Sequence, residues 1–173
     1  MNENEIFPIV DCNGNVVGKA TRRECHSGSM LLHPVVHMHI VDPEGRIYLQ
    51  KRSADKDIQP GRWDTAVGGH VDFNECVKDA LRREAREELG IEIDNYFHLV
   101  TYEFMSEREH ELINAYCMVV NPDAFSPTID KNEISEAKFW SLDEIEQAKG
   151  TGILTPNFES EFDRVKDLIF ELL

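Results

Sequence analysis

The stretch GHVDFNECVKDALRREAREELGI, residues 69–91, decides how this chain folds. Most of it is a run of strong helix formers, ECVKDALRREAREEL at residues 75–89. Asn74 precedes this run at a position that favours a helix cap, and Gly90 follows its last residue. The sequence therefore predicts a helix over 75–89, entered from a loop that begins at Gly69.

Three carboxylates of this predicted helix converge on one face. At about 100° per residue, Glu84 and Glu88 fall within the apolar arc that contains Leu81 and Ala85, and Glu87 lies at the edge of that arc. On a solvated helix the acidic side chains would lie opposite the apolar face. Like charges at this spacing raise one another's pKa, so either a cation or basic side chains from another element must offset them. Oxygen ligands of this kind suit Mg²⁺ or Mn²⁺.

Apolar runs separated by turn signals predict several strands outside this segment. Asn13-Gly14 divides a hairpin at about residues 5–20, and Asp42-Pro43-Glu44-Gly45 divides a second hairpin. Apolar runs at 96–104 and 111–120 predict a third pair of strands. These runs indicate a sheet built largely from antiparallel hairpins.

Two further helices are predicted near the end of the chain. Ser141 stands at the cap of a short helix, and apolar residues at helical spacing predict an amphipathic helix over about 157–172. No linker or repeat divides the sequence, so we expect a single domain over residues 1–173. Strands mixed with helices indicate an α/β layered fold.

The charge balance limits the classes of partner. The chain has 173 residues, with 33 acidic and 18 basic side chains, and its net charge is −15. Such an excess of negative charge disfavours binding to nucleic acid or to an anionic membrane surface. A phosphorylated substrate would therefore need a cation to bring it in, and the surplus carboxylates are suitable ligands for one.

The cysteines and the first residues indicate the compartment. Cys12, Cys25, Cys76 and Cys117 lie far apart and include no CxxC pair, so we expect free thiols in a reducing cytoplasm. The sequence shows neither a basic start followed by an apolar run nor a stretch of about 18 apolar residues. We therefore expect a cytoplasmic protein.

The segment 69–91 resembles the box of the Nudix hydrolases at every fixed position of that 23-residue pattern. The resemblance implies a Nudix-type α/β/α sandwich with a mixed sheet and a central catalytic helix. It also implies metal-dependent hydrolysis of a diphosphate linked to another group, with Mg²⁺ or Mn²⁺ as cofactor. By the same resemblance, Glu84, Glu87 and Glu88 are the catalytic metal ligands, the carbonyl of Gly69 is a further ligand, and Glu75 pairs with Arg83 to hold the loop against the helix.

Features outside the box resemble those of the type 1 isopentenyl-diphosphate isomerases, which share the Nudix fold. The similarity covers about residues 5–146. It implies that Arg52 and Lys56 bind the diphosphate of the substrate. It also implies a second site for a transition metal, Mn²⁺ or Zn²⁺, made by His26, His33, His70, Glu109 and Glu111.

One departure from the isomerases concerns catalysis. Those enzymes have a catalytic cysteine two residues before the position of His70, and here that residue is Gly68. Isomerising an alkene requires positioned acid and base groups, which glycine lacks. Hydrolysis of a small-molecule diphosphate is therefore the preferred interpretation, with isomerisation and non-catalytic binding of a nucleotide or metabolite as alternatives. Many Nudix proteins form homodimers, and the sequence leaves the oligomeric state and the substrate open.

Overall fold

The computed structural model describes residues 2–56 and 58–173. Four helices and nine strands are present in these residues. The strands are β1 (Ile6–Val10), β2 (Val16–Thr21), β3 (Leu32–Val41), β4 (Ile47–Arg52), β5 (Trp63–Thr65), β6 (Val67–His70), β7 (Phe97–Met105), β8 (His110–Val119) and β9 (Ile134–Trp140). The helices are α1 (Arg22–Cys25), α2 (Val77–Leu89), α3 (Leu142–Ala148) and α4 (Pro156–Phe170).

Seven of the strands form one mixed sheet with the long strand β3 near its centre. The strand order is β5-β4-β3-β8-β7, with β6 paired to β3 and β9 paired to β4. β3 and β8 run parallel along their whole length, from Leu32 beside His110 to Val41 beside Val119. The other pairings are antiparallel, and β1 and β2 form a separate hairpin.

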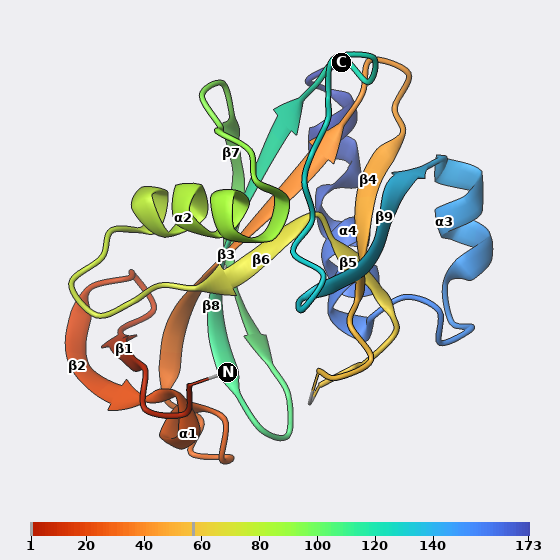
Figure 1. The fold of residues 1–173 in the computed structure, drawn as a ribbon. Helices are drawn as coiled ribbons and strands as arrows, with labels where there is room; N and C mark the ends of the chain where they lie inside the picture. Colours follow the sequence, from red (N-terminus) through yellow and green to blue (C-terminus); the bar gives the residue numbers. More distant parts are fainter. Residues whose placement is uncertain (1, 57) are drawn as a thin grey trace.

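Helices cover both faces of this sheet (Figure 1). Ala80, Leu81, Ala85 and Leu89 of α2 pack against one face in a core that includes Met38 of β3. A second core holds the apolar side chains of α3 and α4 with those of β4, β5 and β9. The predicted α/β/α arrangement with a mixed sheet is therefore confirmed.

The start of α2 differs from the sequence prediction. The helix begins at Val77 and its N-cap is Cys76, whose side chain makes no capping hydrogen bond. Asn74 has a φ of 72° and so belongs to a left-handed turn in the loop before the helix. The predicted end is confirmed, because Gly90 closes the helix with a φ of 64°.

Other elements lie close to their predicted positions. The Asn13-Gly14 turn joins β1 to β2, and Ser141 caps α3 through a reciprocal capping box. The sequence did not predict β9 or the single turn α1, because neither shows a strong periodic pattern. None of the helices in the described residues is long and apolar enough to cross a membrane.

Candidate functional site

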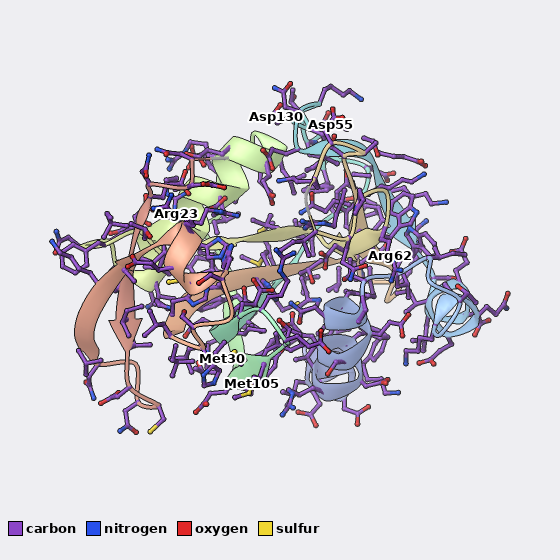
Figure 2. All side chains as sticks on the ribbon, turned by 90° about the horizontal axis from the view of Figure 1, so that it is seen from below. Arg23, Met30, Asp55, Arg62, Met105 and Asp130 are labelled. Atoms are coloured by element: carbon purple, nitrogen blue, oxygen red, sulfur yellow. The ribbon has the colours of Figure 1, made fainter. Side chains whose placement is uncertain are left out.

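A cavity of about 890 Å³ opens on one side of the sheet and collects most of the candidate residues. Side chains from α1, α2, β3, β6, the loop after β4, the β7–β8 connection and the start of α4 line it. In Figure 2, Arg23 on α1, Asp55 in the loop after β4 and Met105 at the end of β7 lie on different sides of the view. The site is therefore assembled from segments that are far apart in the sequence.

Glu84 and Glu88 reach this cavity from the face of α2 that packs on the sheet. Glu88 is 8% exposed, and its Oε2 accepts hydrogen bonds from Nε2 of Gln50 and from the backbone N–H of Gly68, each at 3.1 Å. Glu87 also lines the cavity, but its side chain is 61% exposed. The three carboxylates thus converge from one helix, two of them largely removed from water.

Burial changes the acidity of the two inner carboxyl groups. It raises the pKa of Glu84 to about 7, although the neighbouring Arg83 lowers it. Burial, followed by the charge of Glu84, raises the pKa of Glu88 to about 8. Two carboxyl groups held together against their ordinary acidity form a site that favours a cation.

The backbone of Gly69 lies directly against the Glu84 carboxylate. A Cβ atom at residue 69 would be 2.0 Å from Cδ of Glu84, so no other residue fits this position without moving that carboxylate. This contact explains why the chain needs glycine there. The same contact places the backbone of Gly69 beside a carboxylate that lines the cavity, and carboxylate oxygens are suitable donors for Mg²⁺ or Mn²⁺.

Arg83 ties the loop before α2 to the helix. Its guanidinium group binds both carboxylate oxygens of Glu75, from Nε at 3.0 Å and from Nη2 at 2.9 Å. Nη2 also donates to the carbonyl of His70 at 2.9 Å, and Nη1 donates to Glu84 at 2.7 Å. Since Glu84 has only this one basic partner among the hydrogen bonds of the described residues, the clamp offsets part of the carboxylate charge.

Arg52 at the end of β4 and Lys56 in the loop after it lie on the cavity wall. Nη1 of Arg52 is 3.4 Å from Oδ2 of Asp64, and Lys56 forms an ion pair with Glu133. Burial lowers the pKa of Lys56. Both side chains present positive charge to a cavity that is otherwise rich in acids, as a diphosphate site requires.

The three histidines of the predicted second site lie together. The ligand atoms of His26, His33 and His70 are all within 4.8 Å of one another. Nε2 of His26 is 3.1 Å from Nε2 of His70 and 3.6 Å from a carboxylate oxygen of Glu109. Nε2 of His70 is 4.0 Å from Oε1 of Glu111. The structure thus gathers the three histidines, with Glu109 beside His26 and Glu111 beside His70.

The chemistry of this cluster suits a metal ion. Burial lowers the pKa of His26 to about 4 and lowers that of His33 and His70 as well, so the imidazoles are neutral at pH 7. Nδ1 of His33 hydrogen-bonds the carbonyl of Leu31 at 2.9 Å, which leaves its buried Nε2 without a partner among the described residues. Neutral imidazoles with an unsatisfied ring nitrogen are the form in which histidine binds metals.

The comparison with protein families decides the identity of the fold. The model of the NUDIX domain matches residues 31–159. The chain belongs to the Nudix hydrolase family. The match includes α2, the glycine loop before it and all of the central sheet.

Individual relatives of this Nudix hydrolase agree with both resemblances. An uncharacterised Nudix hydrolase of Nostoc sp. is 31% identical over 142 residues, 81% of this chain and 82% of the relative. An isopentenyl-diphosphate Delta-isomerase of Brevibacterium linens is 28% identical over 172 residues, 96% of this chain and 94% of the relative. The crystal structure of DR0079 from Deinococcus radiodurans has a TM-score of 0.80 at 24% identity, covering 93% of this chain and 99% of that one.

Sequence reasoning missed one polar cluster of this Nudix hydrolase. His37 and His39 of β3 and Tyr102 of β7 all hydrogen-bond Glu161 of α4, which is fully buried. A signal was present, because Glu161 falls within the apolar face that contains Phe158, Phe162 and Val165. Its partners lie on strands more than 50 residues away, so the sequence did not reveal the pairing.

Proposed function

We propose that this Nudix hydrolase cleaves a diphosphate linkage in a nucleoside diphosphate derivative or a similar small metabolite. Mg²⁺ or Mn²⁺ would be held by Glu84, Glu87 and Glu88 and by the carbonyl of Gly69. The burial of Glu84 and Glu88 side by side on the cavity carries the proposal, because burial raises both pKa values and a bound cation would offset the cost of ionising the two acids there. When bound, a divalent ion supplies the charge that offsets the diphosphate and makes a nearby water more acidic.

The side chains of the cavity have distinct roles in this proposal. Arg52 and Lys56 bind phosphoryl oxygens and hold the substrate against α2. Arg83 fixes Glu84 and, through Glu75 and the carbonyl of His70, keeps the glycine loop in place. These contacts orient the linkage before it is cleaved, which lowers the entropic part of the barrier.

A panel of diphosphate compounds tests the proposal. It includes nucleoside diphosphates and triphosphates, nucleotide sugars, dinucleotides and prenyl diphosphates, each with Mg²⁺ or Mn²⁺ and with identification of the products. We expect release of phosphate, pyrophosphate or a nucleotide from at least one compound, and loss of turnover in excess EDTA. Binding without turnover of any compound would instead favour a non-catalytic nucleotide or metabolite-binding module.

We further propose a second metal, Mn²⁺ or Zn²⁺, at His26, His33, His70, Glu109 and Glu111. The unpartnered Nε2 of His33 supports it. Metal analysis of the purified protein tests it, with His33→Asn as the variant, because asparagine keeps a donor near Nδ1 and removes Nε2. We expect about one equivalent of metal per chain to be lost in this variant and retained in His98→Asn on the exposed surface.

The relationship to the isomerases gives a second candidate activity, which we expect to be absent. Gly68 has no side chain to donate or accept a proton at its position. We expect no deuterium from solvent to enter isopentenyl diphosphate in the presence of the protein. Exchange at a catalytic rate would make the protein an isomerase.

The proposed substrate also fits the charge and the thiols of the chain. With a net charge of −15, we expect binding to a small molecule and not to nucleic acid or a membrane surface. Cys12, Cys25, Cys76 and Cys117 are unpaired in the structure, and we propose a location in the reducing cytoplasm. Whether two copies form a homodimer is tested by light scattering.

A further inference from the structure

A buried carboxylate beside the cavity is surrounded by three hydrogen-bond donors. Glu161 of α4 is 0% exposed. Its Oε2 lies 2.8 Å from Nδ1 of His37 and 2.6 Å from the hydroxyl of Tyr102, and its Oε1 lies 2.7 Å from Nε2 of His39. A buried charge with this many short contacts holds its neighbours in fixed orientations.

His37 is the member of this cluster that reaches the cavity. Its side chain is 12% exposed and lines the cavity, whereas His39 is fully buried and Tyr102 does not line the cavity. Because Nδ1 of His37 points at Glu161, Nε2 lies at the opposite edge of the ring. No side chain or backbone group of the described residues hydrogen-bonds that Nε2.

The residue opposite His37 on β6 leaves room for the ring. His37 pairs with Gly68 in the sheet, and a Cβ atom at residue 68 would be 3.3 Å from Cδ2 and 3.6 Å from Nε2 of His37. A side chain at residue 68 would therefore crowd the imidazole and cover the edge that carries Nε2. With glycine at this position, that edge stays open to the cavity.

The surroundings of His37 favour its charged form. Burial lowers the pKa of His37, but the charge and the hydrogen bond of Glu161 outweigh burial, and Asp64 and Glu111 add to them, so the pKa rises to about 9. In the imidazolium both ring nitrogens carry a proton, and Nε2 is then a charged donor. A charged donor that faces a cavity without a protein acceptor binds an acceptor from a ligand.

We propose that His37 contacts the substrate, donating a hydrogen bond from Nε2 to an oxygen of a phosphorylated ligand, and that Glu161 is the residue that positions it. The proposal rests on the proposed function only in taking this cavity as the substrate site. The acceptor is either a phosphoryl oxygen or an oxygen of the group attached to the phosphate. An apolar group at this point would leave the charged donor unsatisfied, which costs stability of the complex.

Two other donors to Glu161 supply matched controls. His37→Asn keeps a donor near the Nδ1 position for Glu161 and removes the nitrogen that faces the cavity. His39→Gln keeps a donor near Nε2, and Tyr102→Phe removes the phenol hydroxyl, so both disturb the same carboxylate without altering the cavity wall. A purely structural role for the cluster predicts similar effects of all three substitutions.

Binding of two analogues that resist hydrolysis tests the proposal in the full-length protein. The probes are methylenediphosphonate, which offers only phosphoryl oxygens, and α,β-methylene-ADP, which adds ribose and a base. With Mg²⁺ present, we expect His37→Asn to weaken the binding of at least one probe tenfold or more, and His39→Gln and Tyr102→Phe to change it less than threefold. In ¹⁵N-labelled wild-type protein, the Nε2 signal of His37 should shift on binding.

The two probes separate the possible acceptors. If His37→Asn weakens the binding of both probes, the acceptor is a phosphoryl oxygen. If it weakens the binding of α,β-methylene-ADP alone, the acceptor is an oxygen of the attached group. Binding of both probes with equal affinity to wild type and His37→Asn, and without a shift of the Nε2 signal, would overturn the assignment of His37 and leave the proposed function intact. Failure of the wild-type protein to bind either probe would contradict both proposals.

Discussion

At the scale of single residues, the site depends on acids that are held away from water. Glu88 receives two hydrogen bonds from Gln50 and Gly68, yet burial and the charge of Glu84 keep its pKa near 8. A carboxylate in such a place costs folding free energy without a cation. This cost makes the role of the pair measurable in two ways, by activity and by stability.

Substituting either inner glutamate should separate function from folding. We expect Glu84→Gln and Glu88→Gln each to lower kcat by about 10²-fold or more, since each removes a charged ligand with little change in volume. Steady-state kinetics at saturating Mg²⁺ measures this. Glu92→Gln, at an exposed surface pair with Arg86, is the control and should keep the wild-type rate. Near wild-type rates in both variants would make this face of α2 structural.

The same substitutions should stabilise the protein when metal is absent. Raised carboxyl pKa values mean that the folded state disfavours ionisation, so the wild-type protein loses stability as the pH rises from about 4.5 towards 8. In EDTA, we therefore expect Glu88→Gln to have a higher Tm than wild type, by a margin that grows between pH 5 and pH 8. A margin that shrinks over this range would mean that Glu88 is stabilised as an anion without metal.

Arg52 and Lys56 should affect binding more than chemistry. Charges on a loop that hold a phosphoryl group stabilise the ground state and the transition state alike. Alanine at either position should raise KM more than it lowers kcat for the substrate found in the panel. Lys51→Ala is the matched control. Lys51 directly precedes Arg52 in the chain but does not line the cavity. A change confined to kcat would instead mean that the substituted side chain contacts the substrate only in the transition state.

At the scale of elements, the parallel pair β3 and β8 and the helix α4 place several polar side chains in the cavity or beside it. β3 carries His33 and His37, β8 carries Glu111, and α4 contributes Glu161 from the other side. Because β3 and β8 run in register over their full length, His33 and Glu111 stand beside each other. This alignment brings two of the proposed metal ligands, which are distant in sequence, next to each other on the sheet.

The link between α4 and β3 should show in the pH dependence of stability. The pKa of His37 is raised from 6.5 to about 9, so its pairing with Glu161 stabilises the fold fully below about pH 6.5 and less as the pH rises towards 9. We expect Glu161→Gln to cost about 3 kcal/mol in the free energy of unfolding near pH 6 and clearly less at pH 9. Urea denaturation measures both values.

The control for this pair lies on the same helix. Asp167→Asn changes an exposed acid of α4 and should have a small effect at both pH values. The groups that face His37 from the packed elements are Glu161, Asp64 and Glu111. A cost of Glu161→Gln that is independent of pH would show that His37 does not change its protonation state between pH 6 and pH 9.

The sequence predicted the elements that local patterns determine. The end of α2 at Gly90, the cap at Ser141 and the turn at Asn13-Gly14 each depend on residues next to one another in the chain. The predicted start of α2 was wrong because Asn74 adopts a left-handed turn and does not cap the helix. Strand β9 was missed because Ser135 and Glu136 are both exposed, which breaks the alternation of apolar and polar residues, and because its pairing with β4 is set by tertiary contacts.

For the site, the sequence pattern of residues 69–91 was enough to predict that the acids of α2 converge on one face of the helix. The gathering of the three histidines followed only from the isomerase resemblance, since the spacing of His26, His33 and His70 does not itself bring them together. The cluster around Glu161 was missed, because pairing between a helix near the end of the chain and a central strand leaves no local signal.

At the scale of the whole molecule, the proposed function requires an acidic chain to bind an anionic substrate. The net charge of −15 repels a diphosphate at long range, and the cavity offsets this repulsion locally with Arg52, Lys56 and the cations that the carboxylates would hold. The cavity of about 890 Å³ is large enough for a nucleotide-sized compound. Activity should therefore depend on the divalent ion for both binding and cleavage.

The most direct measurement follows the substrate found in the panel by ³¹P NMR in ¹⁸O-labelled water, with Mg²⁺, with EDTA and with Glu88→Gln. We predict that the diphosphate linkage is cleaved and that one ¹⁸O atom enters a phosphoryl product, and that this reaction is lost in EDTA and reduced about 10²-fold or more by the substitution. Cleavage at an unchanged rate in EDTA and in Glu88→Gln would contradict metal-dependent hydrolysis at the carboxylates of α2.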